Sequence, residues 1–450
     1  MISIISAERL KRHLPIFVIL AIYLPAACLG HYLFRDESSR DFLILLILFS
    51  LSYGISFPYF SRLYLSMARR AAVLRDVSSS FWEALACGCL LIYLMTLVYV
   101  SWRAPSVPLL VALNGGSLMD IAHSRSQFLA GLTGFESLLR YAVFILGRSI
   151  IPLILVAAFM AGARARFALL GVVLVLSLLS MEKAAPIFVL LPLVLHYAFA
   201  KSWRASVCVL LLLLGSILLM SFLAMGGNSS PAAAGTGAAV ASSEDADMRL
   251  PAGTLITEPI APPERSLLPY YLHVKYGAGQ YRFDPATVAG KSTLLLNRIV
   301  WVPYVTAYNW LEFQRIVLQG HNTYGRSISL VHLLYGEPKM NLEKMVYVFE
   351  YGASPGGEGG SNTVFFVDAK LAFGWLGAIA YSLLFTFCAA CILTSGRREL
   401  IVASIVCLLV ASVSSLTATL LSGGLFIYVV LSLLTGTPSN RSIAGQETAR

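Results

Sequence analysis

Charged side chains are scarce in this sequence. Asp, Glu, Lys and Arg make up only 12% of its 450 residues, whereas 58% of the residues are hydrophobic and the mean hydropathy is +0.76. A soluble domain is roughly half apolar and about a quarter charged. The composition therefore excludes an ordinary soluble protein and predicts a membrane protein that crosses the bilayer several times.

Cysteine is absent from the long segments between the apolar runs. Cys87 and Cys89 are separated by one residue and surrounded by Leu and Ala, which does not fit a zinc site. We therefore expect neither a disulfide framework nor a Cys-ligated metal in the loops, and we expect the cysteines to be small apolar packing residues. The seven are Cys28, Cys87, Cys89, Cys208, Cys388, Cys391 and Cys407.

Signatures of several other functions are missing as well. The sequence has no HExxH motif and no Walker motif, which argues against metal-dependent hydrolysis and against ATP-driven chemistry. It has no internal repeat and no matching pair of Gly- or Pro-broken apolar segments, which argues against a transporter. The net charge of +10 comes from basic residues in short clusters between apolar runs. Such clusters are a topology signal, so no nucleic-acid partner is expected.

Ten apolar runs predict transmembrane spans. The fifth and sixth are short and are separated by Glu182 and Lys183, so they are either two thin helices or one interrupted helix. If they are two helices, most basic clusters fall on one side of the membrane, and the positive-inside rule then favours cytoplasmic N- and C-termini. The predicted spans are 14–33, 42–60, 82–102, 139–161, 167–181, 185–200, 205–225, 371–394, 400–418 and 420–436.

This topology divides the chain into four parts. Residues 1–225 form a bundle of about seven helices, and residues 371–450 form about three helices and a short cytoplasmic tail. Residues 226–264 are low in complexity and nearly without aromatics, which predicts a flexible outer segment. Residues 265–370 interleave Tyr, Trp and Leu with single basic residues, which predicts a structured outer loop with short helices that lie on or re-enter the outer membrane surface.

Basic residues near the outer face are candidate phosphate ligands. Arg148 lies near the middle of the fourth span, where an ionisable residue is costly and often functional, and Arg140 lies two turns earlier on the same helical face. Arginine binds phosphate through two N–H groups; the alternative is that Arg148 pairs with a carboxylate such as Glu83 or caps a broken helix. A ring of these arginines with further cations would bind a diphosphate and stabilise it as a leaving group. The further cations are Lys183, which has pairing with Glu182 as its alternative role, Arg298 and Arg326.

Removal of a proton from a hydroxyl group needs a general base, and the outer candidates are His321, Glu358 and Asp368. His321 lies in a polar turn flanked by glycines, where a neutral imidazole suits proton removal. Glu358 lies in a glycine-rich loop. Asp368 lies two residues from Lys370, so a local ion pair is its alternative role. His332 lies in an apolar run and is expected to be structural.

The run SNTVFFVDAKLAFGWLGA at 361–378 resembles the junction between the outer loop and a late transmembrane helix in the Wzy-type oligosaccharide repeat-unit polymerases. The earlier run QGHNTYGRSISL resembles a Gly-containing stretch of the same loop in that family. The likeness spans about 60 residues, from 319 to 378, whereas the topology agrees over the whole chain and is shared with the related O-antigen ligases. The matching residues are Asn362, Thr363, Phe365, Asp368, Phe373, Gly374, Trp375 and Gly377.

The resemblance implies an all-α, GT-C-like glycosyltransferase that uses neither a metal nor another cofactor. Its implied substrate is an undecaprenyl-diphosphate-linked oligosaccharide, polymerised into surface or exopolysaccharide at the periplasmic face of a bacterial inner membrane. A flippase and a chain-length regulator of the same pathway are its implied partners. The alternatives are a ligase that transfers the glycan to another acceptor and a flippase for lipid-linked saccharides.

Three polar residues in these runs, Asn322, Asn362 and Trp375, are expected to contact sugar, and Lys370 is expected to lie near phosphate. Gly374 and Gly377 are expected to let another helix or a lipid chain approach closely.

Overall fold

The computed structural model describes residues 2–71, 79–116, 118–130, 136–182, 184–225, 297–328, 331–336, 339–351 and 360–436. All regular structure in these residues is helical, which confirms the predicted all-α class. Among the described residues, six helices are long and apolar enough to cross a membrane, so the protein is a multi-pass membrane protein. They are His13–Phe34, Glu37–Ala71, Ser80–Arg103, Leu139–Met160, Trp203–Leu223 and Phe365–Thr394.

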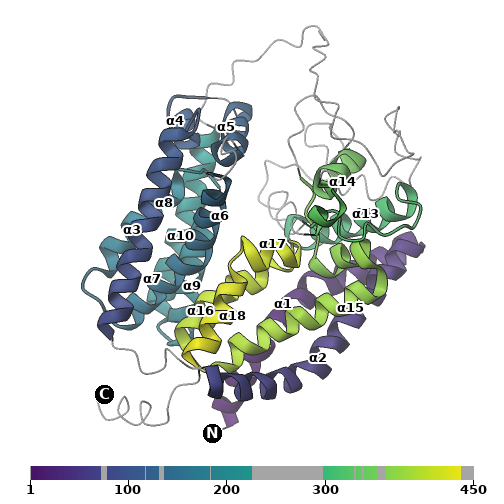
Figure 1. The fold of residues 1–450 in the computed structure, drawn as a ribbon, viewed down its shortest axis with the longest axis horizontal. Helices are drawn as coiled ribbons and strands as arrows, with labels where there is room; N and C mark the ends of the chain where they lie inside the picture. Colours follow the sequence, from purple (N-terminus) through teal and green to yellow (C-terminus); the bar gives the residue numbers. More distant parts are fainter. Residues whose placement is uncertain are drawn as a thin grey trace.

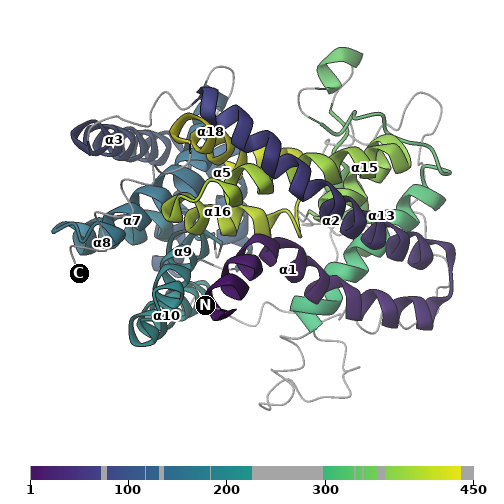
Figure 2. The ribbon, with the colours of Figure 1, turned by 90° about the horizontal axis from the view of Figure 1, so that it is seen from below.

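The helices form two lobes, which lie side by side in Figures 1 and 2. The first, called here the α3 lobe, contains α3 (Ser79–Arg103), α4 (Pro108–Leu113), α5 (Leu118–Ala130), α6 (Ser137–Ile145), the π-helix η2 (Leu146–Ile150), α7 (Ile151–Met160), α8 (Arg166–Leu178), α9 (Ala185–Phe199) and α10 (Trp203–Met225). The second, the α15 lobe, contains α1 (Ile2–Phe34), α2 (Glu37–Ala71), the π-helix η4 (Asn297–Trp301), α13 (Val302–Ile316), the 3₁₀-helix η5 (His332–Tyr335), α14 (Leu342–Tyr351), α15 (Phe365–Thr394), α16 (Arg398–Val410), α17 (Leu416–Leu421) and α18 (Leu425–Thr435). The first two helices of the chain thus pack with its C-terminal helices.

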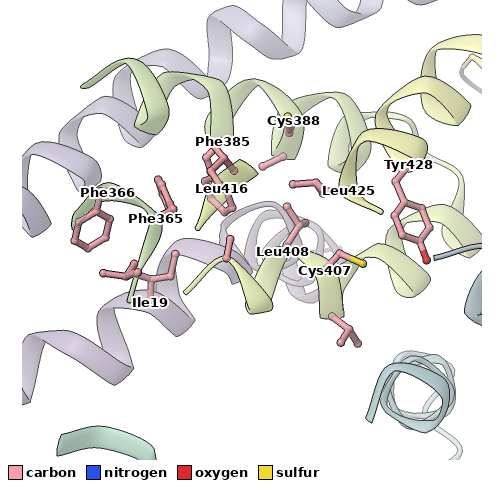
Figure 3. Packing of buried hydrophobic residues seen from close by; sticks show 14 of the residues in the cluster. Ile19, Phe365, Phe366, Phe385, Cys388, Cys407, Leu408, Leu416, Leu425 and Tyr428 are labelled. Carbon is pink, nitrogen blue, oxygen red and sulfur yellow. The ribbon is translucent and has the colours of Figure 1, made fainter. Parts of the chain in front are cut away.

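An aromatic core joins α2 to α15 in the α15 lobe. Phe49 of α2 stacks on Phe366 of α15 with ring centroids 5.5 Å apart, and Phe365 stacks on Phe385 at 4.9 Å. Figure 3 shows the last two rings within the buried cluster that continues through α16, α17 and α18. Because lipid tails are as apolar as these side chains, close van der Waals packing rather than the hydrophobic effect holds such helices together in a membrane.

The two lobes are joined through η2 and α7. Tyr428 of α18 is part of the buried cluster in Figure 3 and donates its hydroxyl hydrogen to the Ser149 carbonyl at 2.8 Å. Gly424 lies so close that an added Cβ would stand 2.4 Å from the Ser149 side chain. In addition, α16 packs on α7 and α9.

The predicted spans agree with the structure in part. The runs at 167–181 and 185–200 are two separate helices, α8 and α9. The runs at 400–418 and 420–436 are instead three short helices, because the chain turns at 411–415 and 422–424. At about 1.5 Å per residue, α16 and α18 are roughly 20 Å and 17 Å long, shorter than a hydrocarbon core of about 30 Å.

Helix α13 of the predicted outer loop is buried among other helices and does not lie on the surface of the protein. Residues 304–314 are buried throughout, and the helix packs against α1, α2 and α15. Two of its buried polar side chains bond to the α1–α2 connection and the start of α2: Tyr308 hydrogen-bonds Asp36, and Ser38 donates to Glu312. The aromatic side chains of α13 are therefore part of the core, because they pack against neighbouring helices rather than against lipid headgroups.

The connections rich in Arg and Lys gather at one end of the molecule. Residues 161–165, 200–202 and 395–397 carry Arg164, Lys201 and Arg397 and lie at the lower end in Figure 1. The opposite end holds α4, α5, α13 and α14. This separation is the pattern that the positive-inside rule describes.

Helix α15 begins earlier than predicted and is broken. It starts at Phe365 rather than at 371, and its backbone leaves helical geometry at Phe373 and at Gly374, which has φ +67° and ψ −158°. The Thr323 amide bonds the Leu371 carbonyl at 2.9 Å, so the outer segment satisfies an acceptor that the break frees. Gly377 was expected to let another helix or a lipid chain approach closely. The close neighbour is instead the Ala369 carbonyl in the first part of the same helix, 2.5 Å from a Cβ added at Gly377.

Replacing Gly374 is expected to destabilise the protein. The φ and ψ angles of Gly374 lie in a region that is nearly restricted to glycine, and an added Cβ would stand 3.2 Å from Asn322 Nδ2. Gly374→Ala should therefore lower the free energy of unfolding by about 1–3 kcal/mol and lower the melting temperature of the protein purified in detergent. Gly171→Ala is the control, because no atom lies within 4 Å of its added Cβ and its φ is ordinary. Equal melting temperatures for the two variants would contradict this reading.

Candidate functional site

A cavity of about 460 Å³ lies between the two lobes. Tyr141 and Phe144 of α6 line it from the α3 lobe, and α17 with Phe426 of α18 lines it from the α15 lobe. The remaining wall comes from Trp310 of α13, from the segment 339–343 and from the start of α15. The Ser and Thr residues of the lining are Ser327, Thr363, Ser415, Thr417 and Ser422.

Asp368 stands in this wall. It is only 5% exposed, it lines the cavity, and no side-chain hydrogen bond of the described residues reaches its carboxyl. The chain before it is fixed by Trp310, whose indole Nε1 donates to the Ser361 carbonyl at 3.2 Å. The Ser361 hydroxyl donates in turn to Glu350 Oε1 of α14 at 3.1 Å. These bonds hold the entry to α15 and so direct Asp368 toward the cavity.

Glu343 and Lys339 are the charged neighbours of Asp368. Both line the cavity, and both interact electrostatically with the Asp368 carboxyl. Part of the Glu343 side chain is exposed, but the surrounding protein removes water from its carboxyl, and this desolvation raises its pKa; Lys339 acts in the opposite direction. Of the described residues in the lining, Lys339 is the one cation.

Two hydroxyl groups in the same wall have no hydrogen-bond partner. Thr363 is 3% exposed, and its Oγ1, like Ser327 Oγ, is buried without a hydrogen-bond partner. Burying a hydroxyl without a partner costs free energy, so such groups are rare unless a bound molecule completes them. Together with the aromatic residues, they give a cavity suited to a ligand with many hydroxyl groups and apolar ring faces.

The ion pair with Lys370, which was the alternative role of Asp368, is not formed. Lys370 Nζ lies 2.7 Å from Asp41 Oδ2 of α2, with side chains that are 12% and 18% exposed, and it also lies over the Trp375 ring at 5.0 Å. Residues two apart on a helix do not face each other, so Asp368 and Lys370 point in different directions. Lys370 is therefore neutralised by Asp41, and neither it nor Trp375 lines the cavity.

Arg148 occupies a second, smaller cavity of about 50 Å³. It pairs with Glu182 at 3.2 Å, so pairing with a carboxylate is confirmed, but Glu83 is the wrong partner. Its guanidinium also lies 4.3 Å from the centre of the Phe144 ring. Because Phe144 lines both cavities, one ring separates Arg148 from the larger one.

The predicted ring of cations around the outer cavity is not present among the described residues. Arg140 lies over the ring of Tyr141 at 5.6 Å, next to the cavity, and Arg326 lies over Tyr335 at 5.2 Å. Neither lines the cavity itself. Lys183 and the side chain of Arg298 lie outside the described residues.

The other predicted site residues have different positions. His321 is exposed and does not line either cavity. The Asn322 amide oxygen accepts from Gln314 at 3.1 Å, and Asn322 packs against the break at Gly374. Asn362 is exposed. Glu358 lies outside the described residues. Three cysteines, Cys388, Cys391 and Cys407, are buried in the core as expected, whereas Cys28, Cys87 and Cys208 are exposed on helix surfaces.

Sequence reasoning missed Glu343 and Lys339. Both lie in a short charged stretch, EPKMNLEK at 337–344, which reads as the polar start of an ordinary surface helix. The one usable signal was the Asn341 side chain, which caps α14 by accepting from the Lys344 amide at 3.3 Å. Such a cap fixes where the helix begins, but not what it faces.

Comparison of the chain with protein families, with curated proteins and with solved structures gave no match.

Breaking the Asp41–Lys370 pair is expected to destabilise the protein strongly. Lys370→Met leaves an almost buried carboxylate without its cation, which should cost about 3–5 kcal/mol, measured by unfolding in mixed micelles. The double variant Lys370→Met, Asp41→Leu should regain most of the loss. Arg40→Met is the control on the same helix, because the side chains of Arg40 and Glu37 are 60% and 62% exposed. Its effect should not exceed about 1 kcal/mol, and an equal effect of both single variants would refute the assignment.

Proposed function

We propose that the protein is a membrane glycosyltransferase that polymerises undecaprenyl-diphosphate-linked oligosaccharide repeat units. It would act at the periplasmic face of a bacterial inner membrane and produce a surface polysaccharide or exopolysaccharide. The observation that carries this proposal is the cavity of about 460 Å³ with the buried Asp368 carboxyl in its wall.

The lining of the cavity supports a saccharide ligand. Sugars present hydroxyl groups at their edges and apolar C–H faces, and the cavity combines Ser and Thr hydroxyls with Tyr141, Phe144, Trp310 and Phe426. Leu420 and Leu421 add apolar side chains to the lining, which fits a substrate that carries a lipid. A soluble metabolite would not need a cavity between membrane helices.

The sidedness of the molecule supports action outside the cytoplasm. The basic connections lie at one end, which the positive-inside rule assigns to the cytoplasm. The cavity is lined by α14 and by the start of α15, and both lie toward the other end (Figure 1). Lipid-diphosphate-linked sugars exposed to the periplasm would thus meet the cavity directly.

The proposed reaction is a displacement at the anomeric carbon of the donor glycan. A hydroxyl oxygen of the acceptor sugar forms the new C–O bond, and the bond between the anomeric carbon and the diphosphate oxygen breaks. The electron pair leaves with the lipid diphosphate, and the hydroxyl proton passes to Asp368 acting as general base. Lys339 in the wall and Arg140 beside Tyr141 are the described cations nearest to the place where the leaving charge develops.

Deletion of the gene tests the proposed function. Lipid-linked material should then remain as single repeat units, because units are still made and flipped but are not joined; this is measured by extracting the lipids and sizing their glycans. Long lipid-linked chains would indicate a ligase instead. Units retained on the cytoplasmic side would indicate a flippase.

Substitutions within the chain test the assignment of the base. Asp368→Asn keeps the size of the side chain but removes its basicity, and should lower polymer formation by at least about 100-fold in a membrane assay. His321→Ala should leave polymer formation near the wild-type level, because His321 lies outside the cavity. Glu399→Gln is the control for loss of a carboxyl, since Glu399 pairs with Arg397 at the other end of the protein. The opposite result, polymer lost with His321→Ala and kept with Asp368→Asn, would exclude Asp368 as the base.

A further inference from the structure

Two carboxyl groups and one ammonium group line the wall of the large cavity. Asp368 comes from α15, Glu343 from α14, and Lys339 from the segment before α14. The three interact electrostatically. No sequence pattern joins Glu343 to Asp368, because 24 residues separate them, so folding alone creates this group.

The charges of this group do not balance when both carboxyls are ionised. One lysine can neutralise one carboxylate, and the other charge would stand in a wall where Asp368 is 5% exposed and receives no hydrogen bond from the described residues. An uncompensated charge at such a place is costly, and two nearby carboxylates oppose each other's ionisation. Retention of a proton by one member of the pair removes this cost.

A separate observation indicates that a ligand meets this group. Thr363 is 3% exposed, lies five residues before Asp368, and lines the same wall with an Oγ1 that has no hydrogen-bond partner. Ser327 lines the same cavity, and its Oγ is also buried without a hydrogen-bond partner. A ligand hydroxyl placed between them could bond both the carboxyl pair and these hydroxyl groups.

We propose that Asp368 and Glu343 form a coupled carboxyl pair that retains one proton near neutral pH and binds the hydroxyl group of an acceptor saccharide. In this pair Asp368 is the member that accepts the proton. Glu343 is a positioning residue that sets the pH at which Asp368 ionises. The catalytic part of this inference rests on the proposed glycosyltransferase function, whereas the coupling of the two carboxyls does not.

The surroundings agree with this assignment. The groups that face Asp368 are Glu343 and Lys339 and, on its own helix, Tyr381, while Tyr141 lines the cavity opposite. Lys370 does not act on the pair as a counter-ion, because Asp41 holds it. Desolvation raises the pKa of Glu343, and Lys339 lowers it.

Carbodiimide labelling measures the coupling without any sugar substrate. Dicyclohexylcarbodiimide adds to a protonated carboxyl in an apolar setting and leaves a stable N-acylurea, which mass spectrometry of the Asp368 peptide quantifies. In membrane vesicles that contain the full-length protein, Asp368 labelling should fall as the pH rises. Glu343→Gln removes a like charge, so the pH of half-maximal labelling should fall by about one unit or more. Lys339→Met removes the counter-charge, so that pH should rise.

The opposite signs of these two shifts separate coupling from misfolding, which could not move the midpoint in both directions. Glu399→Gln is the matched control and should give the wild-type midpoint. An unchanged midpoint in both Glu343→Gln and Lys339→Met would overturn the proposal. Opposite shifts in a protein whose deletion leaves the polysaccharide intact would refute the glycosyltransferase and keep the pair. Loss of polymer with no shift would refute the pair and keep the glycosyltransferase.

Discussion

The hydrogen bond from the Thr323 amide to the Leu371 carbonyl holds together the part of the protein on which the cavity depends. It joins the outer segment to α15 where the helix is broken, and the break divides α15 into a short outer part and a long inner part. The outer part presents Asp368 to the cavity and Lys370 to Asp41 of α2. A helix that continued without the break would lead away from the cavity wall, because the inner part packs along α2 toward the other end (Figure 1).

This arrangement separates the roles of residues that are neighbours in the sequence. Asp368 and Lys370 belong to one turn and have opposite charges, yet one faces a cavity and the other seals the contact between two helices. The buried pair of Lys370 and Asp41 fixes the rotation of the outer part of α15, and the clamp from Trp310 to Ser361 fixes its start. Asp368 therefore has its position determined from both ends, which is the preorganisation that a general base requires.

The helices could be predicted from the sequence because long apolar runs have few alternatives in a membrane. Hydropathy located α1, α2, α3, α10 and α15, and the basic connections separated α8 from α9. Hydropathy could not locate the division of 400–436 into α16, α17 and α18, because the turns at 411–415 and 422–424 are short and consist largely of Ser and Gly, small residues that also occur within membrane helices. It also could not locate the break at Gly374, since a glycine in an apolar run is equally compatible with close helix packing.

Of the candidate general bases and phosphate ligands predicted from the sequence, one described residue, Asp368, lines the cavity. Asp368 drew notice as an acid beside an apolar run, and its place in the cavity wall agrees with that choice. The cations were predicted from their types and approximate depth, but pairing depends on contacts between distant segments: Arg148 with Glu182, 34 residues away, and Lys370 with Asp41, 329 residues away. Such contacts carry no local pattern. Glu343 was missed for the same reason.

The bond from Tyr428 to the Ser149 carbonyl has a mechanical consequence. Ser149 and Tyr141 belong to one continuous helical segment, and eight residues correspond to about 12 Å along its axis. The contacts of Tyr428 and Gly424 with Ser149 hold this segment against α18. They therefore also set how far Tyr141 stands from Phe426 across the cavity that both residues line.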